Sequence, residues 1–185
     1  MEDYNEYLLK RINKYFFDIA QENHDEILGD DSYRFFFMTV EFITGLLESI
    51  KAIEKDFQGM KFLDVGSGTG YICGIAEQMG LHAEGIELNH KLFEISTQMF
   101  PEIKFYEMNC MDFQNYGEYD IIYYWLPFRK PELMEKLKTK LEAELRVGGY
   151  LVLAEEEKQG MGKDNRFTGI NNDEFHNKIW RKLSN

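Results

Sequence analysis

Short apolar runs alternate with helical patterns through the centre of this chain. The runs are rich in aromatic and β-branched side chains, which favour buried strands. Strands are predicted at residues 61–65, 81–88, 103–108, 119–125 and 150–154. Between the last two, leucines recur at helical spacing from Leu133 to Leu145 and predict a helix over residues 131–145. Strands that alternate with helices predict an α/β fold with a doubly wound, mostly parallel sheet.

The N-terminal part of the chain has a helical pattern of its own. Apolar residues recur at helical spacing from Tyr4 to Ile19 and again from Phe35 to Ile50, which predicts a helical extension before the first strand. The aromatic stretch of residues 33–37 has two interpretations. It either belongs to a lid over a ligand site or covers the edge of the sheet.

The C-terminal pattern also has more than one interpretation. Residues 166–170 and 178–183 could pair as antiparallel strands, whereas apolar positions from Phe175 to Leu183 also fit one face of a helix. The tail is short, so a trimmed sheet without these strands is a further alternative.

A glycine-rich loop follows the predicted strand 61–65. Its glycines are Gly66, Gly68 and Gly70, and a helix pattern opens directly after them. Only glycine lets a backbone turn this tightly and approach a ligand without a Cβ in the way. The N-terminus of the next helix presents unpaired N–H groups and the positive end of its dipole. The loop is therefore expected to hold a small polar ligand at the carboxyl end of a strand.

The glycine spacing indicates which ligand is expected. Dinucleotide-binding loops have the pattern G-x-G-x-x-G, but Tyr71 stands where their third glycine would be. With Asp64, the loop instead reads Asp-x-Gly-x-Gly-x-Gly and resembles motif I of the class I S-adenosylmethionine (SAM) methyltransferases. This resemblance implies a Rossmann-like class I methyltransferase fold and SAM as cofactor, with S-adenosylhomocysteine (SAH) as product. It implies loop contacts to the cofactor from Asp64, Gly66, Ser67, Gly68 and Gly70.

The ends of the next two predicted strands carry further candidate residues. Glu87 lies about 20 residues past the glycines, where nucleoside-binding folds place an acid for the ribose hydroxyls. The resemblance gives Glu87 that role and places Leu88 beside it in the cofactor site. At the end of the third strand the family usually has an aspartate for the adenine amino group, but Asn109 stands there, followed by Cys110. Asn109 is favoured for the adenine because its amide oxygen accepts the same hydrogen bond, with Asp112 as the alternative.

The exit of the fourth strand reads Trp-Leu-Pro-Phe at residues 125–128. Methyltransferases that act on nucleic-acid amino groups have Asn/Asp-Pro-Pro-Tyr/Phe there, and Trp125 cannot accept the hydrogen bonds of a target amine. The substrate-facing candidates are Tyr124, Trp125 and Phe128. Tyr123 and Tyr124 point to opposite faces of the sheet, so at most one of them addresses the site. No general base is indicated.

A second, weaker similarity concerns the substrate. Residues 120–128, the charged helix after them and the Arg-Val-Gly-Gly turn at 146–149 are similar to relatives of the non-SET lysine methyltransferases. This similarity implies methyl transfer to a protein lysine, and a small-molecule acceptor is nearly as well supported. A SAM- or SAH-binding protein without transferase activity of its own is the alternative from another functional class.

Composition narrows these possibilities. The chain has 185 residues, of which 44% are hydrophobic, and a formal net charge of −12, which argues against nucleic acid as a partner. It has no apolar run long enough for a membrane span and no signal-peptide pattern, so a cytoplasmic protein is expected. The two cysteines and four histidines show no metal-ligand spacing, and no metal is expected. The oligomeric state is not indicated.

A single domain is predicted, with an N-terminal extension or lid (1–58), a SAM-binding core (59–157) and a C-terminal hairpin or helix (158–185).

Overall fold

The structure, a computed structural model, describes residues 40–125, 127–153, 164–170 and 178–185. The first predicted N-terminal helix and the aromatic stretch 33–37 lie outside these residues. Within them, no helix is both long and apolar enough to cross a membrane.

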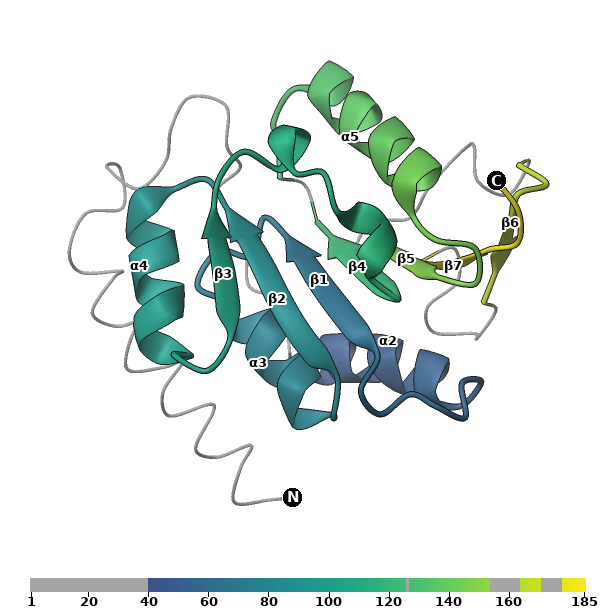
Figure 1. Cartoon of the computed structure of the whole chain (residues 1–185), viewed down its shortest axis with the longest axis horizontal. Coiled ribbons are helices and arrows are strands. Elements are labelled where there is room, and N and C mark those ends of the chain that lie inside the picture. The colour runs from purple at the N-terminus through teal and green to yellow at the C-terminus, as the bar shows by residue number, and fades with distance from the viewer. Residues whose placement is uncertain (1–39, 126, 154–163, 171–177) are drawn as a thin grey trace.

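One seven-stranded sheet organises the molecule, with the strand order β3-β2-β1-β4-β5-β7-β6 (Figure 1). The strands are β1 (Lys61–Val65), β2 (His82–Glu87), β3 (Lys104–Glu107), β4 (Ile121–Tyr124), β5 (Tyr150–Leu153), β6 (Phe167–Gly169) and β7 (Ile179–Lys182). The first five strands pair in parallel, whereas β7 runs antiparallel to both of its neighbours. This arrangement confirms the predicted doubly wound, mostly parallel sheet.

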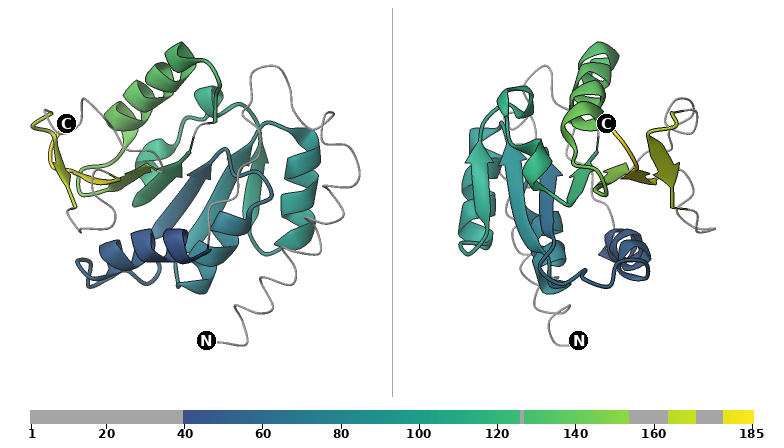
Figure 2. Two further views of the ribbon diagram at one scale, coloured as in Figure 1. Left: turned by 180° about the vertical axis from the view of Figure 1, so that it is seen from behind. Right: turned by 45° about the vertical axis from the view of Figure 1, so that its right-hand side comes forward.

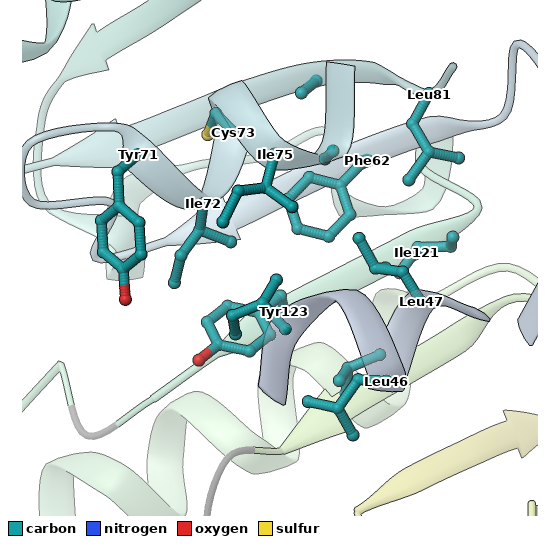
Figure 3. Packing of buried hydrophobic residues seen from close by; sticks show 14 of the residues in the cluster. Leu46, Leu47, Phe62, Tyr71, Ile72, Cys73, Ile75, Leu81, Ile121 and Tyr123 are labelled. Atoms are coloured by element: carbon teal, nitrogen blue, oxygen red, sulfur yellow. The ribbon is translucent and has the colours of Figure 1, made fainter. Parts of the chain in front are cut away.

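Helices cover both faces of the sheet (Figures 1 and 2). They are α2 (Val40–Lys51), α3 (Tyr71–Gln78), α4 (His90–Met99) and α5 (Pro131–Glu144), and two single 3₁₀ turns are η1 (Cys110–Asp112) and η2 (Tyr116–Glu118). Residues of α2, α3 and α4 pack with Phe62 and Tyr123 in one hydrophobic cluster. Figure 3 shows part of this cluster, in which α2 and α3 enclose side chains of β1 and β4. Residues of α5 and of the two 3₁₀ turns form a second cluster with Leu63 and Tyr124 on the opposite face.

The structure decides between a helix and a pair of strands in the C-terminal part of the chain. Residues 179–182 form β7 between β5 and β6. The prediction of a helix for this stretch is therefore wrong, and the prediction of two antiparallel strands is confirmed. The sheet is also not trimmed. Ile179 is fully buried and Trp180 is nearly so, and on alternate positions they fill the two opposite clusters. A strand that is buried on both faces has consecutive apolar residues, and such a run also fits a helix. The apolar pattern alone therefore could not distinguish a strand from a helix.

Candidate functional site

The glycine loop after β1 has the tight left-handed conformation that its sequence predicts. Gly66, Gly68 and Gly70 have φ values of 84°, 55° and 77°, which side-chain-bearing residues rarely adopt. The backbone N–H groups of Gly66 and Ser67 both donate to the Ile86 carbonyl at 2.9 Å, so the loop is fixed to β2. These bonds hold the loop at the carboxyl end of the sheet.

The loop lies where the sheet changes its winding direction. From β1 the chain proceeds to β2 on one side, and β4 pairs with β1 on the other. A Cβ added to Gly66 would lie 3.1 Å from Cβ of Pro127, in the turn after β4. The turns after β1 and β4 therefore approach each other at the position where open α/β sheets bind ligands.

Gly85 of β2 is a second glycine that other residues approach closely, and no pattern in the sequence singles it out. A Cβ at this position would lie 2.7 Å from Cδ1 of Phe105 and 2.7 Å from Oγ of Ser67. The loop can therefore lie against β2 only because residue 85 has no side chain. Its contact partners come from β3 and from the loop, and a local pattern does not reveal them.

Glu87 ends β2 and is buried beside the glycine loop. Its Oε2 accepts the backbone N–H of Gly68 at 2.8 Å, and its Oε1 accepts the backbone N–H of Asn89 at 2.7 Å. Burial raises the pKa of the Glu87 carboxyl, and these backbone donors counteract the rise. A carboxylate has about four acceptor positions, so two hydrogen bonds leave it able to accept two ribose hydroxyls.

Polar side-chain atoms without partners surround the same loop. Among the described residues, no hydrogen-bond partner is found for Asp64 Oδ2, Ser67 Oγ, Thr69 Oγ1 or the Tyr123 hydroxyl, all of which are buried. Burial raises the pKa of the Asp64 carboxyl well above its usual range, and the nearby Glu87 raises it further. Buried polar groups are nearly always hydrogen-bonded, so this cluster fits a site that is completed by a polar ligand.

The residues predicted to contact adenine lie beyond Glu87. Leu88 follows Glu87 directly and is 62% exposed, so its side chain is available for an apolar contact with a ligand. The Asn109 side-chain oxygen accepts the Met111 N–H at 2.9 Å and caps η1, which leaves one lone pair and the amide NH₂ for other contacts. Cys110 is buried, and burial raises the pKa of its thiol to about 12. Asp112 is exposed.

The candidates at the exit of β4 separate onto two faces. Tyr124 and Phe128 are buried in the cluster under α5, whereas Trp125 packs against the opposite cluster, which also contains Tyr123. Burial raises the pKa of the Tyr124 hydroxyl. Asp64 pairs with Tyr123 in the β1–β4 register, so Tyr123 and not Tyr124 faces the same side as Asp64. The predicted alternation of these tyrosines is therefore confirmed, and Tyr123 joins the candidate site residues.

Known proteins resemble this chain in sequence and in fold. No protein-family model matches the chain. Over 102 residues it is 33% identical to protein-L-isoaspartate O-methyltransferase of Cytophaga hutchinsonii, a match that covers 51% of this chain and 42% of that protein. The matched segment thus spans less than half the length of this relative.

Solved structures extend the likeness to most of the chain. Magnesium protoporphyrin IX methyltransferase of Synechocystis with bound SAM superposes with a TM-score of 0.61 at 17% identity, over 94% of this chain and 95% of that chain. An RNA methyltransferase of Salinibacter ruber with SAH superposes with a TM-score of 0.54 at 18% identity, over 78% of this chain and 88% of that chain. The sheet order, the glycine loop and these likenesses establish that the chain has the fold of the class I SAM-dependent methyltransferases.

Proposed function

We propose that this protein is a SAM-dependent methyltransferase. The observation that carries the proposal is the cluster of buried, unpartnered polar atoms around the glycine loop, next to Glu87 at the switch point of the sheet. Such a cluster lowers the stability of the free protein, because a buried polar group without a partner costs about 1–3 kcal/mol. A ligand with hydroxyl, amino and carboxylate groups would satisfy it.

The residues around the glycine loop offer a contact for each part of SAM. Glu87 would accept hydrogen bonds from the ribose hydroxyls, and Leu88 and Asn109 would contact the adenine. The loop residues Ser67, Gly68 and Thr69 and the acid Asp64 would face the amino-acid end. This assignment agrees with the roles that the motif resemblance implies. It also accounts for the buried hydroxyls of Ser67 and Thr69.

The chemical demands on the protein are modest. Bound SAM supplies a methyl group on a positively charged sulfur, which is a good leaving group. The chain has to hold the acceptor in line with that methyl group and keep water away. Trp125 lies on the face of Asp64 and Tyr123, and its indole ring could hold a cationic or apolar acceptor by cation–π attraction and packing. Tyr124 and Phe128 would support this turn from the opposite face.

The acceptor is proposed to be a protein lysine or, as second candidate, a small molecule. The net charge of −12 favours a basic partner over a nucleic acid. The apolar exit of β4 also lacks the side chain that accepts hydrogen bonds from a base amine. The relatives named above have different acceptors, so likeness to them does not select one.

Methyl-labelled SAM and a cell lysate test the function directly. The purified protein is incubated with both, and protein, nucleic acid and small molecules are then separated. Label in the protein fraction would support lysine transfer, and label in the small-molecule fraction would support the second candidate. If no fraction is labelled while SAH binds in calorimetry, the protein is a SAM-binding protein without independent transferase activity. That alternative draws support from the apolar turn after β4.

Substitutions separate the cofactor site from the acceptor site. Glu87→Ala and Gly68→Val are expected to weaken SAH binding about tenfold or more without unfolding the protein. Trp125→Ala should lower the rate of transfer and leave SAH affinity within about twofold. Unchanged affinity in both cofactor-site variants would place the ligand elsewhere.

A further inference from the structure

Tyr123 carries a buried hydroxyl that no described residue satisfies. Its side chain is 2% exposed, and its hydroxyl has no hydrogen-bond partner among the described residues. By contrast, Tyr150 on the same face of the sheet donates its hydroxyl to Oε1 of Glu54 at 2.6 Å. A buried hydroxyl without a partner costs about 1–3 kcal/mol, and such groups are rare in folded proteins. The Tyr123 hydroxyl is therefore available to a ligand.

The register of β4 places Tyr123 between the proposed cofactor site and the exit of this strand. Tyr123 pairs with Asp64 of β1, and Trp125 follows two residues later on the same face. Figure 3 shows the hydroxyls of Tyr71 and Tyr123 at the same end of the hydrophobic cluster. This is the carboxyl end of the sheet, because α3 begins with Tyr71 directly after the glycine loop. Three aromatic side chains thus lie where a methyl acceptor would meet the cofactor.

The charged groups that act on Tyr123 are acidic. Burial raises the pKa of the Tyr123 hydroxyl, and so does the adjacent Asp64, whose own pKa is raised by burial and by Glu87. Lys178, which lies over the Phe42 ring at 5.5 Å, is not among the groups that shift either pKa. Within the described part of the chain, these surroundings favour positive charge that develops on an acceptor over negative charge that it carries.

We propose that the methyl acceptor is an amine nitrogen and that the Tyr123 hydroxyl oxygen accepts a hydrogen bond from it. This proposal rests on the proposed function and names the nucleophile, which a lysine and a small-molecule acceptor can share. The amine reacts in its neutral form, after losing a proton to solvent, and one of its N–H groups donates to Tyr123. This contact orients the nitrogen lone pair.

The transfer balances without a further reactant. The nitrogen–carbon bond forms as the carbon–sulfur bond breaks, and the electron pair of the broken bond stays on sulfur. The methylated nitrogen carries the positive charge and then loses one proton to solvent. Tyr123 keeps its own proton throughout, in agreement with the raised pKa of its hydroxyl.

The chemical stability of the transferred label tests the nature of the acceptor. The full chain is incubated with methyl-labelled SAM and cell lysate, and the labelled fraction is treated with mild alkali. Alkali hydrolyses a methyl ester and releases labelled methanol, whereas an N-methyl group is stable. The expected result is that the label survives alkali and that prior acetylation of the amino groups in the lysate abolishes labelling. Release of the label by alkali, or labelling that acetylation leaves unchanged, would overturn the proposal.

Matched substitutions assign the hydrogen bond to Tyr123. Tyr123→Phe should lower the initial rate of labelling about tenfold at saturating SAM, while SAH affinity stays within about twofold of wild type. It should not lower the free energy of unfolding, since this hydroxyl has no partner in the described structure. Tyr150→Phe is the control, because it removes a hydroxyl on the same face at the amino end of β5. Its labelling rate should stay within about twofold of wild type.

The possible outcomes separate this proposal from the proposed function. Labelling by Tyr123→Phe at the wild-type rate would overturn the proposal. A loss of SAH affinity as large as the loss of rate would also overturn it, since the hydroxyl would then serve the cofactor and not the acceptor. If wild-type protein binds no SAH and labels no fraction, the proposed function itself is wrong.

Discussion

Asp64 is a residue whose burial opposes folding. It lies under the glycine loop with one carboxylate oxygen unpartnered among the described residues, and both burial and Glu87 raise its pKa. Residues in ligand sites often carry such a cost, because their partner is present only in the complex. The consequence can be measured as a change in stability with pH.

Asp64→Asn is predicted to stabilise the free protein at neutral pH. The folded-state pKa of Asp64 is raised, so its contribution to stability is fully present below the unfolded-state pKa of about 3.9 and is lost as pH rises through the folded-state value. The neutral amide removes this loss. Denaturant titrations of both proteins should show a difference that favours the variant at pH 7 and shrinks as pH falls. A variant that is less stable at neutral pH would contradict this account.

Gly85→Ala is predicted to destabilise the protein by about 1–3 kcal/mol. The new Cβ would meet Phe105 and Ser67 at 2.7 Å, so the loop or β3 must shift. Gly148→Ala is an informative comparison, because Gly148 has open space around its Cβ position but a φ of 85°. Its cost should be about 1 kcal/mol and should come from the backbone alone. Only the Gly85 variant should also lose SAH affinity, which calorimetry would detect.

The sequence predicted the features of the candidate site that depend on local backbone geometry. The three loop glycines and Glu87 were predictable, because left-handed turns and a strand-end acid leave a pattern in the chain. Tyr123 and Gly85 were missed because their importance depends on which residue lies beside them on another strand. Once the β1–β4 register is known, Tyr123 is identified as the residue that lies beside Asp64 on the same face of the sheet.

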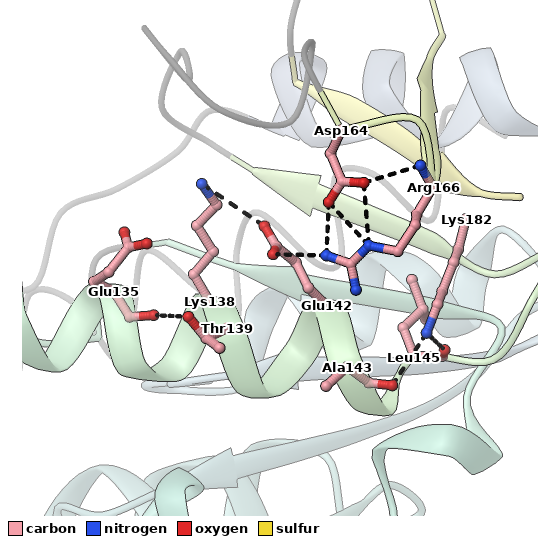
Figure 4. Close-up of polar contacts among 9 residues, drawn as sticks. All are labelled: Glu135, Lys138, Thr139, Glu142, Ala143, Leu145, Asp164, Arg166 and Lys182. Carbon is pink, nitrogen blue, oxygen red and sulfur yellow. Dashed lines mark hydrogen bonds and ion pairs between the residues drawn. The ribbon is translucent and has the colours of Figure 1, made fainter. Parts of the chain in front are cut away.

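At the level of elements, α5 receives its C-terminal cap from another part of the chain. The helix has no basic residue in its last turn. Lys182 of β7 donates its Nζ to the carbonyls of Ala143 at 3.1 Å and Leu145 at 2.8 Å (Figure 4). A cation at this position interacts favourably with the helix dipole and satisfies carbonyls that a helix end leaves free. The cap joins α5 to the antiparallel part of the sheet.

Lys182→Met is therefore predicted to cost about 2 kcal/mol of folding free energy. Methionine keeps the apolar length of the side chain and removes both hydrogen bonds. Lys51→Met serves as the control, because among the described residues Lys51 makes only a solvent-exposed pair with Glu48 at 3.4 Å, and its loss should cost less than about 0.5 kcal/mol. Denaturant unfolding measures both. Equal losses would mean that the cap contributes nothing beyond an ordinary surface lysine.

The sequence predicted where the strands lie more reliably than which strands pair with each other. The five parallel strands were recognised from apolar runs, with ends that differ by at most two residues from the observed bounds. For residues 178–183 the same signal fitted a helix, because Ile179 and Trp180 are buried on opposite faces. Pairing with β5 makes this segment a strand, and that pairing depends on residues outside the segment.

At the scale of the whole molecule, Glu54 links distant parts of the chain. Its Oε1 accepts the Tyr150 hydroxyl of β5 at 2.6 Å and pairs with Nη2 of Arg181 in β7 at 3.0 Å. Tyr150 is fully buried. Glu54 lies in the connection between α2 and β1, so this contact joins that connection to β5 and β7. A carboxylate held by a buried hydroxyl and a guanidinium is worth more than an exposed ion pair.

Glu54→Ala is predicted to lower the free energy of unfolding by about 1–3 kcal/mol, since it leaves the Tyr150 hydroxyl without its acceptor. Glu48→Ala, in the preceding helix α2, is the control, and its exposed pair with Lys51 should contribute less than about 0.5 kcal/mol. Thermal unfolding of the two variants provides the comparison. If Glu54→Ala unfolds no earlier than the control, the link does not hold the two parts together.

The position of β7 has a consequence for the order in which the protein is made. β7 lies between β5 and β6, and among the described strands it is the sole partner of β6. During synthesis, β6 leaves the ribosome before the strand that joins it to the sheet exists. The five parallel strands can assemble from the N-terminal side while translation proceeds. Because β7 is its only partner among the described strands, β6 stays unpaired until residues 179–182 emerge, and the later-made strand then joins it to the sheet.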